Sequence, residues 1–230
     1  MIELRNITKK YGTKVALKIE GLTINQGDSV GLVGNNGAGK TTMLSLILDQ
    51  IKPETGEVYS KSKQVNRTDD WKFYTGSYLD ERFLIPHLTP TEYLEFVGSL
   101  HDRSKNEVMT YIRENEAFYE EDLFTRKKYI RDLSTGNKNK VGILSALLSS
   151  PELLILDEPF ASLDPTSQAW LKKRLTEYHE SGTTMILSSH DLGHVTSVSS
   201  RVILLEDGQV IKDNNTTQET LSELESYFLL

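Results

Sequence analysis

The chain contains no cysteine among its 230 residues. Disulfide bonds and thiolate chemistry are therefore excluded, both as supports for the fold and as catalytic groups. The absence of cysteine agrees with a reducing compartment, although cysteine-free proteins also occur in oxidising ones. The fold must rest on a hydrophobic core, and a chain of this length is long enough to bury one.

Long apolar runs are missing as well. No run approaches the roughly 18 residues that a membrane-spanning helix needs. The N-terminal stretch MIELRNITKK alternates apolar and polar residues and lacks the apolar block of a secretory signal. We therefore expect the chain to stay in the cytoplasm, where any attachment to a membrane would be made through another protein.

The chain also lacks an excess of basic charge. The chain has 26 Lys and Arg against 33 Asp and Glu, for a net charge of −7. Proteins that hold nucleic acid by its phosphates normally present a basic face. The two short basic runs, Arg126-Lys127-Lys128 and Lys172-Lys173-Arg174, are typical of solvated helix faces. The charge balance disfavours a nucleic-acid partner without excluding it.

The hydrophobic pattern predicts strands and helices in alternation at both ends of the chain and a mostly helical block between them. Strands are expected at 17–24, 29–34, 153–157, 183–190 and in two pieces within 201–214, and helices at 41–51, 164–182 and 217–228. The alternation within residues 1–7 is irregular, and residues 89–148 are mostly helical by pattern, with Ser104 and Glu107 spaced as a helix cap. The sequence thus predicts an α/β sheet core (1–76 and 150–230) that carries an inserted α-helical subdomain (about 77–149).

A glycine-rich stretch, GNNGAGKT, fits the phosphate-binding pattern G-x-x-x-x-G-K-[ST] and stands between an apolar strand and a helix. Glycines let the backbone turn so that its N–H groups point at phosphate oxygens, and the helix start adds a positive dipole end. A plain glycine-rich turn is the alternative, but this pattern arises by chance in roughly one chain of this length in a hundred. We predict a nucleotide-binding loop formed by Gly34, Asn35, Asn36, Gly37, Ala38, Gly39, Lys40, Thr41 and Thr42.

Each polar group of this region has a chemical role to match. Lys40 supplies a point charge for the β and γ phosphates, the Thr41 hydroxyl can bind Mg²⁺, and Thr42 can reach the α-phosphate. Asp157 ends an apolar strand, where it can hold Mg²⁺ through water and through Thr41. Glu158 follows and can act as the general base for the attacking water. Alone, the two carboxylates could merely cap a turn, but together with the glycine loop they indicate hydrolysis of a nucleotide.

Five motifs, GNNGAGKTT, LSTGN, LLILDEP, SLD and SSHD, follow one another here in a characteristic order and spacing. In this the sequence resembles the ATP-binding cassette (ABC) ATPase domain over essentially its whole length. The resemblance implies a P-loop NTPase sheet core with an inserted helical subdomain, with ATP and Mg²⁺ as cofactors. It also implies that two cassettes enclose two ATP molecules between them.

The resemblance assigns roles to five further residues. Tyr11 would stack on adenine, and Ser134 and Gly136 of LSTGN would contact the nucleotide bound to the opposite subunit. Asp164 of SLD would link the two nucleotide sites, and His190 would act as the switch histidine that orients the γ-phosphate and the water. Without the resemblance, Tyr11 is a surface aromatic, the LSTGN stretch with Ser134 and Gly136 is one helix cap, Asp164 is another, and His190 is a structural histidine.

Two motifs depart from the family pattern. In LSTGN, Thr135 replaces a glycine and Asn137 a glutamine, which predicts a working but altered signature. In the segment SYLDERFLIPHLT, Glu81 stands where the family usually has glutamine. Its carboxylate can still bind Mg²⁺ or accept a hydrogen bond from water, but it adds negative charge beside Asp157 and Glu158. We expect Glu81 to couple motion to a partner instead of acting as the base.

The resemblance predicts the ATP-hydrolysing subunit of an ABC transporter. Its partners would be transmembrane permease subunits, received near residues 83–91, and a second copy of itself or a paralogous cassette. It would sit at the cytoplasmic face of the membrane, and the short tail after Asn215 favours the exporter-type group. The alternative is a soluble ABC ATPase that acts on a ribosomal or nucleic-acid assembly, although such proteins usually carry two cassettes or a long coiled coil. Intact Lys40, Asp157, Glu158 and His190 argue against a non-catalytic regulator.

Overall fold

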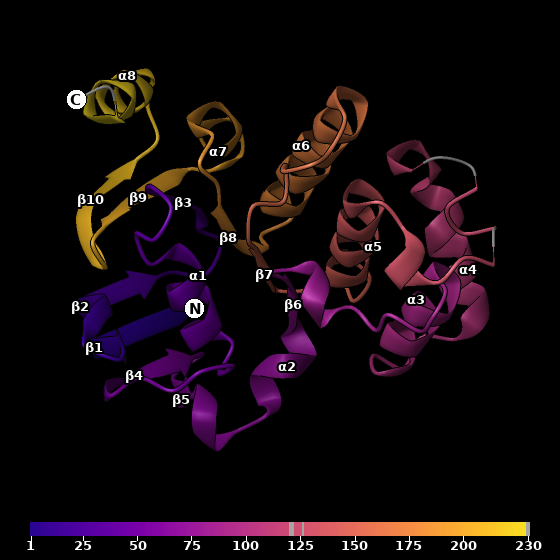
Figure 1. Ribbon diagram of the computed structural model, residues 1–230, viewed down its shortest axis with the longest axis horizontal. Coiled ribbons are helices and arrows are strands. Elements are labelled where there is room, and N and C mark those ends of the chain that lie inside the picture. The colour runs from indigo at the N-terminus through magenta and orange to yellow at the C-terminus, as the bar shows by residue number, and fades with distance from the viewer. Residues whose placement is uncertain (120–121, 126, 229–230) are drawn as a thin grey trace.

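The computed structural model describes residues 1–119, 122–125 and 127–228 (Figure 1). Arg126, which begins one of the two basic runs, lies outside the described residues. The N-terminal part of the chain forms an antiparallel sheet with the strand order β2-β1-β4-β5. Its strands are β1 (Ile2–Tyr11), β2 (Lys14–Ile24), β4 (Thr55–Ser60) and β5 (Lys63–Gln64).

The second sheet has six strands in the order β10-β9-β3-β8-β7-β6. Its strands are β3 (Ser29–Val33), β6 (Thr75–Tyr78), β7 (Leu153–Leu156), β8 (Thr184–Ser188), β9 (Arg201–Glu206) and β10 (Gln209–Asn215). All neighbouring pairs are parallel except β9 and β10. Because parallel strands end at the same edge, the segments after β3, β8 and β7 meet there, which is where ligands bind in such sheets.

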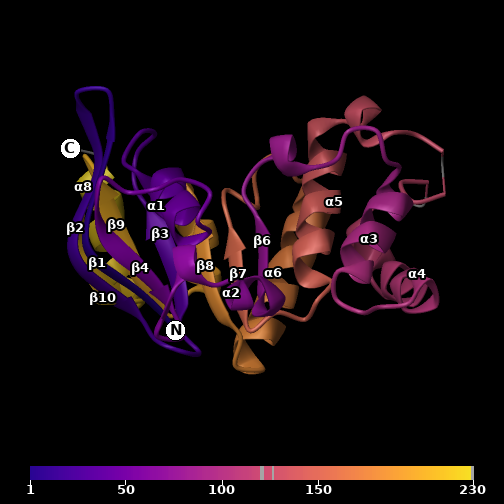
Figure 2. The same ribbon diagram turned by 90° about the horizontal axis from the view of Figure 1, so that it is seen from below.

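Helices cover this sheet and extend beyond one of its ends. The helices are α1 (Lys40–Ile47), α2 (Asp70–Tyr74), α3 (Pro90–Ser99), α4 (Lys105–Glu114), α5 (Thr135–Leu147), α6 (Pro165–Glu180), α7 (Leu192–Val198) and α8 (Gln218–Phe228). Figure 2 shows α5 between the sheet and the pair α3 and α4. Within the described residues, no helix is long and apolar enough to cross a bilayer.

Two large apolar cores hold these layers together. One lies between the two sheets and includes Leu4, Leu44 and Ile155, all fully buried. The other packs α3, α4, α5 and α6 against the sheet and includes Phe118 and Leu144. The runs LLIL and TMILS are buried along their whole length because both faces of the parallel sheet are covered.

Most predicted elements are confirmed, and the exceptions have local causes. Residues 1–7, irregular by pattern, begin the long strand β1, in which Asn6 has a φ of 50° and the pairing with β4 shifts register. This irregularity lets both Leu4 and Ile7 face the core although they are three positions apart. The helix expected over 41–51 ends earlier, at Ile47, and Asp49 beyond it has a φ of 50°.

The central block also differs in part from the expectation. The predicted helices are present, and the Ser104–Glu107 capping box is confirmed. However, the stretch between α4 and α5 contains only short 3₁₀ turns among its described residues, at Glu116–Phe118 and Ile130–Asp132. The short elements α2, β4, β5, β6 and α7 were not predicted. The expected boundary after residue 76 falls within β6, and the division into core and helical subdomain stays a prediction.

Candidate active site

A pocket of about 340 Å³ opens at the carboxyl edge of the parallel sheet, beside the glycine loop. It is lined by Tyr11, Lys14, Ala16, Asn35, Asn36, Gly37, Gly39, Lys40, Thr41, Thr42, Asp157 and Glu158. The structure thus brings most of the predicted loop together with the predicted aromatic and both carboxylates. Gly34 and Ala38, the two remaining loop residues, do not line the pocket, and Ala38 is buried.

The shape of the loop depends on two glycines that no other residue could replace without strain. Gly34 has a φ of 152°, and a Cβ atom there would lie 2.3 Å from the carbonyl oxygen of Leu205. Gly39, the residue before α1, has a φ of 109°, and its Cβ would lie 2.8 Å from the carbonyl oxygen of Ala16. The first N–H groups of a helix have no acceptor within it, so α1 presents free donors to an anion at this end.

Lys40 places a nearly buried cation in the pocket, with 7% of its side chain exposed. Its Nζ donates to the carbonyl oxygen of Gly34 at 2.6 Å and lies 3.7 Å from Oε1 of Glu158. A buried ammonium requires anionic or hydrogen-bonding partners. The phosphates of a nucleotide would provide both.

Asp157 is the most buried carboxylate of the pocket and is held by two hydroxyl groups. Thr41 donates to its Oδ2 at 2.5 Å, and Ser188 donates to its Oδ1. Burial raises the pKa of Asp157, while these two hydrogen bonds oppose the rise. A carboxylate and a hydroxyl suit Mg²⁺, which proteins usually hold by one or two side chains together with substrate phosphates. The described residues contain no group of three His, Cys, Asp or Glu able to hold a metal. Thr41 and Asp157 stay the predicted ligands, and their hydroxyl and carboxylate oxygens fit Mg²⁺.

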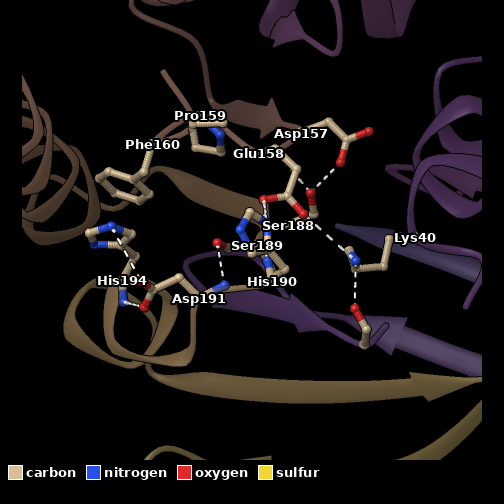
Figure 3. Close-up of polar contacts among 12 residues, drawn as sticks. Lys40, Asp157, Glu158, Pro159, Phe160, Ser188, Ser189, His190, Asp191 and His194 are labelled. Atoms are coloured by element: carbon tan, nitrogen blue, oxygen red, sulfur yellow. Dashed lines mark hydrogen bonds and ion pairs between the residues drawn. The ribbon is translucent and has the colours of Figure 1, made fainter. Parts of the chain in front are cut away.

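Glu158 is fixed by the backbone of the neighbouring strand. It has a φ of 48°, an uncommon conformation for a residue other than glycine, and its N–H donates to the carbonyl oxygen and the Oγ of Ser188 at 3.2 and 3.0 Å. Its Oε2 lies 2.9 Å from Nδ1 of His190 and accepts a bond from the N–H of His190 at 3.2 Å (Figure 3). When ionised, the carboxylate can only accept, so Nδ1 is then the donor of that pair.

His190 does not line the pocket itself but reaches it through Glu158. Three other predicted residues, Ser134, Gly136 and Asp164, lie away from the pocket on what we name the α5–α6 face. Ser134 caps α5 by accepting from the N–H of Asn137 at 3.3 Å, and a Cβ at Gly136 would lie 2.6 Å from the carbonyl oxygen of Ser162. Asp164 caps α6 and pairs with Nζ of Lys140 at 2.9 Å. The hydrogen bonds that it accepts, chiefly from Ser167, hold the pKa of Asp164 well below its usual range.

Glu81 also lies outside the pocket. It begins a 3₁₀ turn, Glu81–Phe83, that follows β6. Its Oε2 lies 3.3 Å from Nζ of Lys138 on α5, so the added negative charge has a basic partner. Its role as a metal ligand stays a prediction.

Sequence reasoning missed Ser188, which bonds both carboxylate-bearing residues. The β7–β8 register pairs Leu156 with Leu187, so the residue after each lies side by side, and the hydroxyl of Ser188 meets Asp157. The signal was present in the stretch SSH that ends the predicted strand. It could be interpreted only once these two strands were known to be neighbours.

Comparison with known proteins shows the family of this chain. A sequence profile of the ABC transporter family matches residues 17–161. The uncharacterized ABC transporter ATP-binding protein YhaQ of Bacillus subtilis is 32% identical over 216 residues, which cover 92% of this chain and 70% of the relative. The spermidine/putrescine import ATP-binding protein PotA of Mesoplasma florum is 32% identical over 234 residues, which cover 100% of this chain and 65% of the relative. The chain therefore spans about two thirds of the length of these curated relatives.

A solved structure matches the fold along almost the whole chain. It is the dimeric, post-hydrolysis state of the ATP-binding cassette MJ0796 bound to ADP and Pi, with a TM-score of 0.80 and 29% identity. The match covers 94% of this chain and 99% of that one. The chain belongs to the ABC transporter family. It is an ATP-binding cassette with the α/β fold predicted from its sequence, and ATP hydrolysis coupled to transport is characteristic of this family.

Proposed function

We propose that this chain binds ATP and Mg²⁺ in the pocket at Lys40 and hydrolyses the ATP for a transporter. The observation that carries this proposal is the meeting of four side chains from three separate segments at one edge of the sheet. Lys40, Asp157, Glu158 and His190 are joined by contacts of 3.7 Å or less, directly or through Thr41 and Ser188.

The arrangement divides the chemical work among these residues. Lys40 and the N–H groups at the start of α1 bind the phosphates, and Thr41 and Asp157 hold Mg²⁺. When bound, Mg²⁺ neutralises phosphate charge as it develops. Glu158 accepts the proton of the attacking water, and His190, hydrogen-bonded to its Oε2, orients that carboxylate. Tyr11, 55% exposed on the rim of the pocket, is available to stack on adenine.

A second cassette completes the site in this proposal. Ser134 and Asp164 are exposed and lie outside their own chain's pocket, at the starts of two helices. The N-terminus of α5 attracts anions and would face the nucleotide of a partner. The dimeric state of the similar cassette MJ0796, which holds ADP and Pi, supports this arrangement.

The membrane partner is a set of separate permease subunits, which places the chain at the cytoplasmic face of the membrane. Support comes from the names of the relatives, which are ATP-binding proteins of transporters. The docking region is 83–91, where Phe83 is 54% exposed. The sequence favours the exporter-type group, whereas PotA is named for import, so the direction of transport stays a prediction.

Phosphate release and nucleotide binding test the proposal. The purified chain should release phosphate from ATP only with Mg²⁺ present. Glu158→Gln should bind ATP about as tightly but lose turnover by roughly 10²-fold or more, the size of a general-base contribution. If Glu158→Gln kept its turnover, the assignment of the base would be wrong. If the wild type bound no ATP, the proposed function itself would fail.

A further inference from the structure

Two aromatic rings join the segments that carry Glu158 and His190. Phe160 lies two residues after Glu158, and His194 lies four residues after His190, in the first turn of α7. The rings of Phe160 and His194 stack with their centroids 4.6 Å apart and their planes at 24° (Figure 3). This contact is the side-chain link between the turn that follows the base and the helix that follows the switch histidine.

Phe160 is held firmly on its own side of the stack. It is 3% exposed and packs in the core formed with α5 and α6. On α5, the amide of Asn139 donates to the carbonyl oxygens of Pro159 and Ala161 at 3.1 and 2.7 Å. On α6, the amide of Gln168 donates to the carbonyl oxygen of Phe160 at 3.3 Å. The ring of Phe160 is therefore a fixed surface against which a mobile partner can be positioned.

The imidazole of His194 makes few polar contacts. Its Nε2 lies 3.7 Å from Asp191, and within the described part of the chain its Nδ1 has no hydrogen-bond partner. Burial lowers the pKa of His194, with Lys172 and His190 adding to the effect and Asp191 opposing it. The side chain is thus favoured as a neutral, flat ring, and stacking on Phe160 is its main interaction.

The hydrogen bond between His190 and Glu158 needs further contacts to keep its geometry. The side chain of His190 is 67% exposed, so its bond to Glu158 competes with water. Nearby, the N–H of Asp191 donates to Ser189 at 3.0 Å, and the N–H of His194 donates to Asp191 at 3.1 Å. These bonds hold the segment 189–194 together, while its start is anchored by the N–H of Ser189, which donates to the carbonyl oxygen of Leu32 at 3.2 Å, and by the N–H of His190, which donates to Glu158. The far end of the segment, at His194, needs a contact of its own. The stack on Phe160 supplies such a contact.

We propose that His194 is a positioning residue for ATP hydrolysis, whose ring on Phe160 keeps His190 aligned with Glu158. The proposal rests on the function proposed above. An aromatic pair of this kind changes a rate or an equilibrium by about two- to tenfold when it is removed. The effect should fall on turnover and spare ATP binding, because neither ring lines the nucleotide pocket.

Ring-keeping and ring-removing variants of His194 provide the first test. His194→Phe keeps a flat ring without the ring nitrogens, whereas His194→Gln keeps a polar group without the ring. We expect His194→Gln and His194→Ala to lower kcat by about three- to tenfold while KM for ATP changes by less than about twofold, and His194→Phe to stay close to the wild type. Equal turnover in all three variants and the wild type would overturn the proposal, as would a loss confined to KM.

A double-mutant cycle tests whether Phe160 is the partner. Phe160→Leu removes the stack, and adding His194→Ala to it should cost nothing further, because coupled residues are not additive. Losses that multiply would show that the two rings act separately and would overturn the proposal.

Two controls separate this inference from general damage and from the proposed function. His179→Ala on α6 changes another half-buried histidine whose Nδ1 has no partner in the described residues, and it should leave kcat unchanged. Thermal unfolding of each variant identifies a general loss of stability. If Glu158→Gln lost its activity but His194→Gln did not, only the positioning role would fail. If Glu158→Gln kept its activity, the assignment of the base would be wrong, and if the wild type bound no ATP, the proposed function itself would fail.

Discussion

The pocket at Lys40 and the α5–α6 face carry residues of similar polarity in opposite surroundings. In the pocket, Lys40 and Asp157 are each 7% exposed, and each contacts a distant segment, Lys40 through Glu158 and Asp157 through Thr41. On the α5–α6 face, Ser134 and Asp164 are exposed, and each bonds to the first turn of its own helix. The pocket is therefore organised within one chain. The α5–α6 face is a pair of capped helix ends, which in the proposed dimer would meet the nucleotide of a partner.

The largest effect expected within one chain is the loss of ATP affinity after a substitution in the pocket. Lys40→Ala should lower ATP affinity by about 10²-fold or more, because losing one partner of a buried charge pair costs about 2–5 kcal/mol. Lys18→Ala removes an exposed lysine outside the pocket and is the matched control. Equilibrium binding of a fluorescent ATP analogue measures both variants. Unchanged affinity in Lys40→Ala would contradict the assignment of the loop.

Glu81 provides a useful third case because it belongs neither to the pocket at Lys40 nor to the α5–α6 face. Glu81→Gln restores the residue that is usual in the family and breaks an ion pair with Lys138 in which Glu81 is 42% exposed. Such pairs are worth about 0.2–1 kcal/mol, so basal ATPase activity should stay within a few-fold of the wild type. Steady-state phosphate release is the measurement. A loss as large as that of Glu158→Gln would show that Glu81 shares the catalytic work.

The smallest expected effect lies on the α5–α6 face and concerns stability. Asp164→Ala removes the cap of α6 and should cost about 1 kcal/mol of unfolding free energy, whereas Asp164→Asn keeps a capping side chain and should cost less. Because the folded-state pKa of Asp164 is lowered, its charge stabilises the fold at neutral pH, and this contribution is lost as the pH falls through that lowered pKa. Urea unfolding at several pH values should therefore show that the difference in unfolding free energy between the wild type and Asp164→Ala becomes smaller in acid. A difference independent of pH would contradict the role of the charge.

The nucleotide pocket could be predicted from the sequence to the extent that its signals are local. The loop 34–41 is one continuous pattern, and Asp157 and Glu158 follow directly from an apolar strand. Ser188 and the bond between His190 and Glu158 could not be predicted, because they depend on β7 and β8 lying side by side across about thirty residues of chain.

The same difference between local signals and contacts with distant segments explains which parts of the fold could be predicted. Long apolar or amphipathic runs were predicted correctly, whereas β6 and α7 are short and are stabilised by neighbours instead of by their own pattern. In β1, the left-handed Asn6 interrupts the alternation that sequence reasoning requires. The α5–α6 face looked like helix caps by pattern, and in one chain Ser134 and Asp164 are indeed the caps of α5 and α6. Only the family resemblance predicts a second role for them.

Light scattering on three variants tests most directly whether the α5–α6 face completes the pocket of a partner chain. Glu158→Gln with saturating ATP and Mg²⁺ should have twice the 26.0 kDa mass of one chain, because uncleaved ATP holds two cassettes together. Adding Ser134→Asp, which keeps the cap of α5 but brings negative charge to the partner's phosphates, should return the protein to one chain, whereas Ser134→Asn should not. A Glu158→Gln protein that stays a monomer with ATP bound, or a dimer that Ser134→Asp does not weaken, would contradict the account.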